Sequence, residues 1–236
     1  MKKDLNIVCI IPARGGSKGI PKKNIIDVCG KPLVAWSIEQ AQNSKYLKGH
    51  VYVSSDCDEI LDVAKAYGAK TIKRPDDISG DKASSESALF HAILEIEKNS
   101  SKIDLIVFLQ ATSPLRESKD IDNAIEELIS KDFDSLFSAS ELEDFFIWTY
   151  DENKNLTSLN YDFLNRKRRQ DVSAQFVENG SIYVFKPQVL FDHNNRLGGK
   201  IGMSLMENWK MYEIDSLEDK ALCEYYIKSK KLGDYK

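Results

Sequence analysis

Short apolar runs alternate with helix-like segments along much of the chain, and this alternation limits the fold more than any other feature. Between the runs, apolar residues recur at helical spacing, as at Ala88, Ala92, Ile93 and Ile96. Apolar runs of this kind are typical of strands buried on both faces, so the alternation predicts an α/β fold with a mostly parallel sheet and helices on both faces. Ligands of such sheets bind beyond the carboxyl ends of the strands. The predicted strands cover residues 7–11, 51–53, 103–109, 136–139 and 181–185.

The alternation breaks between residues 141 and 176, where aromatic residues stand among many charges without a low-complexity linker on either side. We therefore expect a single domain over residues 1–236 with an inserted lobe at 141–176. Exposed aromatic side chains in the lobe would suit a homodimer interface. An aromatic hairpin packed on its own core fits the composition equally well. The aromatic residues are Phe145, Phe146, Trp148, Tyr150, Tyr161 and Phe163.

Charge and composition exclude several classes of protein. The formal net charge of −4 argues against a nucleic-acid partner, because non-specific binders need a basic face. The N-terminal apolar run holds only about six residues before Pro12 and Arg14, too few for a signal or membrane segment, and no later stretch is long enough. The four cysteines form no CxxC pair and no zinc-site spacing. We therefore expect a cytoplasmic protein that does not bind membranes.

The loop after the first apolar run has the composition of a phosphate-binding turn. It reads PARGGSKGIPKKN over residues 12–24. Its glycines permit a tight turn with inward-pointing N–H groups, and we expect those of Gly15 and Gly16 to face phosphate. The spacing matches neither a P-loop nor G-x-G-x-x-G, and a solvated basic turn is the alternative. Four cations, which can grip phosphate, lie within ten residues of this acidic chain: Arg14, Lys18, Lys22 and Lys23.

Two other segments carry groups suited to a sugar and a metal ion. Gln110 ends a predicted buried strand and offers a donor and an acceptor for a sugar hydroxyl or amide, although a simple turn explains the segment as well. Glu213 and Asp215 lie two residues apart, so in an extended segment both face one side and could share Mg²⁺. Alternatively, Asp215 is a charge that flanks a helix. Residues 216–219 have the spacing of a capping box, with Asp219 in place of the usual Glu or Gln, which predicts that the final helix begins at Ser216.

Two further basic segments are weaker candidates. Arg74 follows a short predicted strand and could hold a phosphate or a ribose. The basic run at residues 166–169 could bind the carboxylate of an acidic sugar, but most runs of this kind are solvated surfaces.

Taken together, these segments resemble the acylneuraminate cytidylyltransferases, which activate sialic acid and relatives such as legionaminic and pseudaminic acid as CMP-sugars. In the related Kdo cytidylyltransferases, the first loop has a sequence like ARYxSTRLPGKP. The first loop of this chain does not match that sequence. The matching segments follow one another over nearly the whole chain: IPARGGSKGIPKKN at 11–24, GKPLVAWSI at 30–38, RP at 74–75, DKASS at 81–85, LQATSPLR at 109–116, RRQ at 168–170, ENGSIYVF at 178–185 and EIDSLED at 213–219.

The resemblance implies a Rossmann-like sheet of the nucleotide-diphospho-sugar transferase kind, with CTP, Mg²⁺ and a nonulosonic acid as ligands. It also implies a homodimer in which the lobe reaches the neighbour's active site. The catalytic residues would be Arg14, Lys23 and Asp215. By motif position, the resemblance implies that the nucleotide and its phosphates are bound by Arg14, Ser17, Lys18, Lys23 and Asn24. Arg74 and Ser85 would contact the CMP portion, Gln110 and Arg169 would contact the sugar, and Asp215 would bind the metal.

The reaction that this resemblance implies is attack by the anomeric hydroxyl of the sugar on the α-phosphorus of CTP, with release of pyrophosphate. The chain departs from the family at Glu213, where many sialate enzymes have Asp, and at Val177-Glu178, where some have Arg-Pro before the Asn-Gly pair. A nucleotidyltransferase for another base or for another acidic sugar such as Kdo is one alternative. A non-catalytic nucleotide-binding module is the other.

Overall fold

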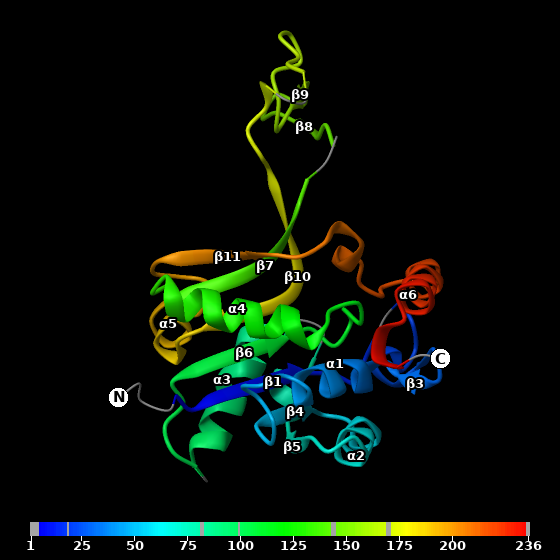
Figure 1. The fold of residues 1–236 in the computed structure, drawn as a ribbon, viewed down its shortest axis with the longest axis vertical. Helices are drawn as coiled ribbons and strands as arrows, with labels where there is room; N and C mark the ends of the chain where they lie inside the picture. The colour runs from blue at the N-terminus through cyan, green and yellow to red at the C-terminus, as the bar shows by residue number, and fades with distance from the viewer. Residues whose placement is uncertain are drawn as a thin grey trace.

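A central sheet of seven strands organises the molecule (Figure 1). The computed structural model describes residues 5–17, 19–80, 83–98, 100–142, 145–168 and 171–234. The strands are β1 (Ile7–Pro12), β4 (Val51–Ser55), β5 (Lys70–Lys73), β6 (Leu105–Leu109), β7 (Ser135–Glu141), β10 (Phe176–Phe185) and β11 (Ile201–Leu205).

The sheet is mostly parallel, as the sequence predicted. Its strands lie in the order β11-β7-β10-β6-β1-β4-β5. Only β10 runs against its neighbours β6 and β7, and the other four pairings are parallel. The strand expected at residues 181–185 thus begins earlier, at Phe176, and is antiparallel.

Helices cover both faces of this sheet. The helices are α1 (Leu33–Gln42), α2 (Asp58–Ala66), α3 (Ser85–Glu97), α4 (Ser118–Ser130), α5 (Pro187–His193) and α6 (Leu217–Lys230), and the 3₁₀ turns are η1 (Lys23–Ile25), η2 (Asp76–Ile78), η4 (Asn208–Met211) and η5 (Leu232–Asp234). Among the described residues, no helix combines the length and apolar character needed to cross a bilayer.

The apolar alternation of β1 explains why both faces are covered. Cys9 and Ile11 pack with residues of α1, α2 and α4 on one face, whereas Val8 and Ile10 pack with residues of α3 and α5 on the other. All four side chains are almost fully buried. Because a strand presents alternate residues to opposite faces, only a continuous apolar run can satisfy both layers.

The chain between Glu141 and Phe176 leaves the sheet. These two residues are the outermost pair of the β7–β10 ladder. Beyond them, β8 (Trp148–Tyr150) and β9 (Leu156–Ser158) form a small antiparallel hairpin. Figure 1 shows this lobe standing well away from the sheet on a two-stranded stalk. A shorter hairpin, β2 (Asp27–Val28) with β3 (Lys31–Pro32), precedes α1.

Candidate active site

A cavity of about 510 Å³ opens at the carboxyl ends of β1, β5 and β6, where an α/β sheet is expected to bind its ligands. It is lined by residues from five separate parts of the chain. Nine of the residues that were predicted from the sequence line it: Arg14, Ser17, Lys23, Asn24, Arg74, Ser85, Gln110, Glu213 and Asp215.

The glycine-rich loop is held by contacts that differ in part from those expected. The N–H of Gly15 donates to Asp56 Oδ1 at 2.9 Å, so this amide faces a carboxylate that follows β4 and not the cavity. A Cβ atom at Gly15 would lie 2.8 Å from that of Cys57, which explains the glycine. Gly16 does not line the cavity either, and Lys18 lies outside the described residues. Asn24 fixes the loop from inside by donating to the carbonyl of Arg14 at 2.9 Å.

The same loop contacts the segment that carries the predicted metal ligands. A Cβ atom at Gly19 would lie only 2.7 Å from the carbonyl oxygen of Asp215, so the backbones approach as closely as glycine allows. Lys23 Nζ lies 2.6 Å from Asp215 Oδ1. The two segments, which are 192 residues apart in the chain, therefore form one wall of the cavity.

Two arginines, Arg14 and Arg74, also line the cavity. Arg74 is 5% exposed and donates to the carbonyl oxygen of Ser54 at 2.6 Å. Burial lowers the pKa of Arg74, and nearby Arg14 lowers it further, while Asp56 opposes both. Because two guanidinium groups lie close together in a partly dehydrated place, a bound anion would relieve their repulsion.

The N-terminus of α3 also faces the cavity. Ser84 caps this 13-residue helix by accepting from the N–H of Ser87 at 3.1 Å, and Ser84 and Ser85 both line the cavity. The positive end of the helix dipole favours negatively charged groups at this position. The cationic loop, the pair of arginines and the N-terminus of α3 therefore all favour an anionic ligand.

Glu213 and Asp215 face the cavity from an extended segment. Ile214 between them is fully buried, and its N–H donates to the carbonyl of Thr112 at 2.8 Å, so the two carboxylates point the other way. Glu213 Oε2 accepts from Thr112 Oγ1 at 3.1 Å and from Gln110 Nε2 at 3.4 Å. The capping box forms as predicted, with Ser216 and Asp219 as partners, and starts α6 directly after Asp215.

The two carboxylates fit a hard cation that is shared with a phosphorylated ligand. Burial raises the pKa of Glu213, and the charge of Asp215 raises it further, against the hydrogen bond from Thr112. A positive charge at this point would favour the ionised pair. Among the described residues, no cluster of three or more His, Cys, Asp or Glu could hold a metal alone. Mg²⁺ needs only one or two carboxylates when phosphates supply further oxygens.

The raised pKa of Glu213 predicts a pH-dependent gain in stability on its removal. A carboxyl group whose pKa is raised in the folded state lowers the free energy of unfolding once the pH rises above its ordinary pKa of 4.5, because the group ionises more readily in the unfolded chain. We therefore expect Glu213→Gln to have a higher Tm than the wild type at pH 7, and no advantage at pH 4. Thermal unfolding at both pH values checks this. Glu152→Gln, at an exposed position in the lobe, is the control and should change neither Tm.

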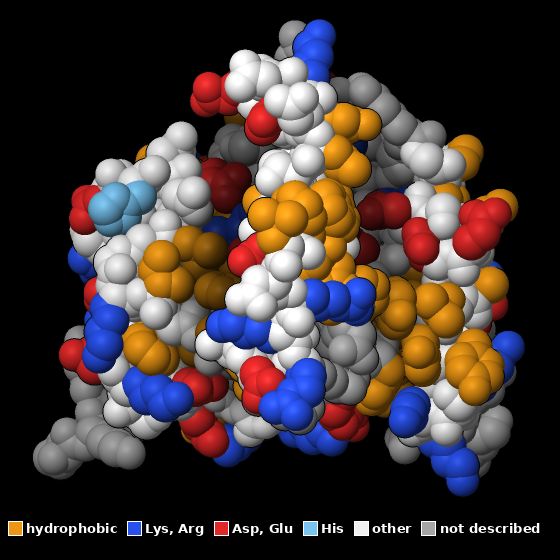
Figure 2. Space-filling view, turned by 90° about the horizontal axis from the view of Figure 1, so that it is seen from above, with side chains coloured by type: hydrophobic (Ala, Val, Ile, Leu, Met, Phe, Trp, Pro, Cys, Tyr) orange, Lys and Arg blue, Asp and Glu red, His pale blue; other side chains and the backbone are white. Residues whose placement is uncertain are grey.

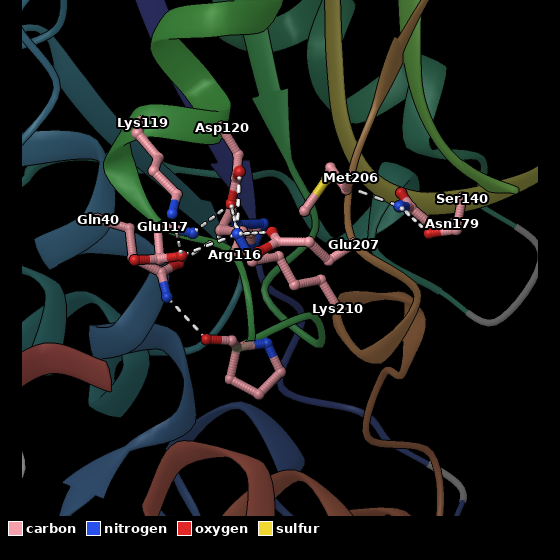
Figure 3. A network of polar contacts seen from close by, with 11 residues as sticks. Gln40, Arg116, Glu117, Lys119, Asp120, Ser140, Asn179, Met206, Glu207 and Lys210 are labelled. Atoms are coloured by element: carbon pink, nitrogen blue, oxygen red, sulfur yellow. Dashed lines mark hydrogen bonds and ion pairs between the residues drawn. The ribbon is translucent and has the colours of Figure 1, made fainter. Parts of the chain in front are cut away.

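Two buried cations under the site were not predicted from the sequence (Figure 3). Arg116 ends the segment LQATSPLR at 109–116, but no local feature of that sequence indicates that its side chain is buried. Lys210 is fully buried, and its Nζ lies 2.8 Å from Glu117 and Asp120 and 2.6 Å from Glu207. Burial opposes its charge, yet the hydrogen bonds that Lys210 donates to these carboxylates raise its pKa overall. Lys210 thus fixes η4 three residues before Glu213.

The described part of the basic run, residues 166–168, lies apart from this cavity. Arg166, Lys167 and Arg168 line a second cavity of about 500 Å³ in the lobe, which shares no lining residue with the first. The guanidinium of Arg166 stacks 4.0 Å from the ring centre of Phe146. Arg169 lies outside the described residues. Within one chain, Arg166, Lys167 and Arg168 therefore line a different cavity from Gln110, the other predicted sugar contact.

Comparison with known proteins identifies the family. A family model described as cytidylyltransferase matches residues 8–233. The chain belongs to the cytidylyltransferase family. This cytidylyltransferase is 39% identical over 202 residues to N-acylneuraminate cytidylyltransferase A of Danio rerio, 33% identical over 231 residues to post-translational flagellin modification protein B of Campylobacter coli, and 40% identical over 178 residues to pseudaminic acid cytidylyltransferase of Campylobacter jejuni. The resemblance inferred from the motifs is confirmed.

The lengths of these relatives differ. The matched region covers 84% of the cytidylyltransferase described here but only 45% of the Danio rerio protein. It covers 97% of the Campylobacter coli protein and 76% of the Campylobacter jejuni protein.

Solved structures support the fold. This cytidylyltransferase superposes on CMP:2-keto-3-deoxy-manno-octonic acid synthetase complexed with CTP with a TM-score of 0.71 at 15% identity, over 95% of this chain and 99% of the other. It superposes on 4-diphosphocytidyl-2C-methyl-D-erythritol synthase from Anaerococcus prevotii with a TM-score of 0.67 at 12% identity, over 96% and 100% of the chains. The predicted nucleotidyltransferase-type fold is therefore confirmed.

Proposed function

We propose that this cytidylyltransferase transfers CMP from CTP to the anomeric hydroxyl of a nonulosonic acid and releases pyrophosphate. The observation that carries the proposal is the single cavity in which the cationic loop, Arg74 and the Glu213–Asp215 pair meet. The similarity to N-acylneuraminate and pseudaminic acid cytidylyltransferases indicates the class of the acceptor.

The nucleotide would bind along the part of the cavity that carries Arg14, Lys23 and Arg74. Arg14 and Lys23 would hold the phosphates, with Lys18 as a predicted further contact, while Arg74 and Ser85 would face the CMP portion. Asn24 would act on the loop that carries Arg14, since its amide donates to that carbonyl. Holding the reactants in line and neutralising phosphate charge are the main tasks of a protein in such a transfer.

Mg²⁺ fits the two carboxylates, and Asp215, with Glu213 behind it, would hold the ion. When bound, a divalent ion polarises the α-phosphate and lowers the pKa of the attacking hydroxyl. Glu213 is itself braced by Thr112 and Gln110, so the carboxylate has a defined orientation before any ligand enters. Because Gln110 lines the same cavity and its Nε2 lies 3.4 Å from Glu213 Oε2, it is placed to hydrogen-bond an acceptor sugar close to that ion.

A substrate panel tests the proposal. CTP and UTP are each combined with Mg²⁺ and with N-acetylneuraminic, legionaminic, pseudaminic and Kdo acids, and pyrophosphate release is measured. We expect turnover with CTP and at least one nonulosonic acid. Turnover with Kdo alone, or with UTP alone, would assign the site to another nucleotidyltransferase reaction. No pyrophosphate from any pair would favour the non-catalytic module.

We further propose a homodimer in which the lobe of one chain completes the cavity of the other. Arg166, Lys167 and Arg168 line the cavity in the lobe and not the first cavity, so a sugar contact by the next residue, Arg169, would call for a second chain. Figure 2, which looks down onto the lobe, shows apolar side chains gathered along it and on the surface beside it. Apolar surface of this extent is typical of an interface. The most exposed apolar side chains of the lobe are Phe145, Tyr150, Leu156, Leu159 and Leu164.

This arrangement predicts that a charge on the lobe separates the dimer. Leu164 is 84% exposed, so Leu164→Asp should not disturb the folded chain but should place a charge in the apolar interface. We expect light scattering to give a dimer for the wild type and a monomer for Leu164→Asp, with loss of most turnover. Leu94→Asp, on the outer side of α3, is the matched control and should remain an active dimer. A fully active monomeric wild type would exclude a site shared between chains.

The cytoplasm is the location that we propose for this enzyme. Cys9, Cys29, Cys57 and Cys223 are all free thiols, which is the usual state in a reducing compartment.

A further inference from the structure

We infer that Arg116, a residue buried beneath the cavity, positions Gln110 for the acceptor sugar, an inference that rests on the proposed function. Arg116 is 1% exposed and does not line the cavity. It therefore cannot touch the substrate through this cavity, and any effect that it has on the reaction must pass through a neighbouring residue. The side chain lies at the start of α4 in Figure 3.

Arg116 joins three elements around the end of β6. Its Nη1 donates to the carbonyl oxygen of Ser181 on β10 at 2.9 Å. Its Nη2 donates to Ser37 Oγ on α1 at 2.8 Å and to the carbonyl oxygen of Gln110, and its Nε donates to Gln40 Oε1 at 3.3 Å. The planar fork of the guanidinium satisfies these acceptors at fixed angles, which the flexible ammonium of a lysine cannot do.

The charge of Arg116 is retained despite its burial. Burial lowers the pKa of Arg116 to about 10, while Cys9 and Asp120 oppose this change. The group therefore remains protonated at neutral pH and donates throughout the working range. A buried charge costs free energy unless it is hydrogen-bonded, and Arg116 meets this requirement through its acceptors on α1, on β10 and at the end of β6.

The side chain of Gln110 is confined on two sides. A Cβ atom at Gly180 would lie 2.5 Å from Gln110 Oε1, and Gly180 has a φ of +68°, so only glycine leaves room for this amide. On the other side, Gln110 Nε2 lies 3.4 Å from Glu213 Oε2. Arg116 thus holds the main chain of Gln110, while Gly180 and Glu213 limit where its amide can lie.

The contacts of Arg116 predict which half of the reaction depends on it. None of these hydrogen-bond partners is Arg14, Lys23 or Arg74, the cations that line the cavity, whereas Gln110 is the predicted contact to the sugar. Loss of the guanidinium fork should therefore weaken use of the acceptor and leave CTP binding unchanged. A small displacement of a substrate-positioning group is enough to reduce rate substantially.

The experiment compares Arg116→Lys with the wild type in steady-state kinetics and in calorimetric binding of CTP with Mg²⁺. We expect kcat/KM for the acceptor to fall by about tenfold or more, with the Kd for CTP within about twofold of the wild type. Arg74→Lys is the matched control, because Arg74 is also a buried arginine bound to a backbone carbonyl. It should show the opposite pattern, with weaker CTP binding and an unchanged KM for the acceptor.

A double-mutant cycle separates positioning from a merely structural role. If Arg116 acts through Gln110, Arg116→Lys should have no further effect on acceptor kcat/KM in a Gln110→Ala background. An undiminished effect in that background, or equal losses for CTP and acceptor, would overturn the inference. If Arg116→Lys fails to fold, Ser37→Ala replaces it, because this change removes one acceptor of the guanidinium, leaves Gln110 itself intact and should give a smaller acceptor defect of the same kind. Unchanged acceptor kinetics in Ser37→Ala would then overturn the inference. A wild type that releases no pyrophosphate with any acid would instead refute the proposed function.

Discussion

Replacing Asp215 with asparagine is expected to lower kcat by about a hundredfold or more while leaving the chain folded. The substitution keeps the size of the side chain but removes the charge that would hold Mg²⁺ against the nucleotide phosphates. The cost in stability should be small, because the Asp215 side chain is 65% exposed and an ion pair at such a position contributes little to folding. Pyrophosphate release under saturating CTP and acceptor, with Tm measured in parallel, checks both statements.

Asp62→Asn is the control for this experiment. Asp62 lies on α2 at a comparable exposure of 75% and, like Asp215, lies within 4 Å of a lysine nitrogen, but it does not line the cavity. It should retain wild-type turnover. Near-normal turnover of Asp215→Asn would remove the metal role from this residue and leave Glu213 without a partner for the ion.

The local pattern of the sequence was sufficient for the sheet and for most of the cavity. Runs without polar residues can only be satisfied by burial on both faces, so β1 and β6 could be placed from their composition. The loop after β1 and the segment at Glu213 and Asp215 carry their chemistry within a few residues, so their side chains could be identified as well. The capping box at Ser216 and Asp219 is equally local, and it forms as expected.

Features that depend on distant partners could not be predicted. The direction of β10 follows from its antiparallel pairing with β6 and β7. An apolar run predicts a buried strand but does not indicate whether that strand is parallel or antiparallel to its neighbours. Asp56 engages the amide of Gly15 only because the chain brings the ends of β1 and β4 together. Lys210 stands between Trp209 and Met211 in the sequence, but this local context does not reveal that its ammonium pairs with Glu117, Asp120 and Glu207.

This difference has a physical cause. Periodicity reports how much of a side chain is buried, but not which groups it meets there. Phosphate-binding loops are readable because one short segment supplies most of the ligands. Arg116 illustrates the opposite case, since its partners come from α1, β10 and the end of β6 and share no spacing.

Replacing Lys23 with methionine should have two opposite effects. Turnover should fall by about a hundredfold or more, because a cation that faces the phosphates is lost. Divalent-ion binding to the nucleotide-free protein should become tighter, by something on the order of tenfold, because Lys23 Nζ now lies 2.6 Å from the carboxylate that would hold the ion. In the absence of nucleotide, the lysine and a metal ion compete for Asp215. With CTP present, the phosphates attract Lys23 and the carboxylate becomes available.

Mn²⁺ binding, followed by electron paramagnetic resonance with and without CTP, measures the second effect independently of catalysis. Lys22→Met is the matched control, since the neighbouring lysine pairs with Glu59 on α2 at 2.7 Å and does not line the cavity. It should bind Mn²⁺ as the wild type does. We expect CTP to strengthen Mn²⁺ binding more in the wild type than in Lys23→Met, because the variant has already lost the competing charge. Equal Mn²⁺ affinity of the wild type and Lys23→Met without nucleotide would show that Lys23 does not compete with the ion for the Asp215 carboxylate. The ion would then have to bind through Glu213.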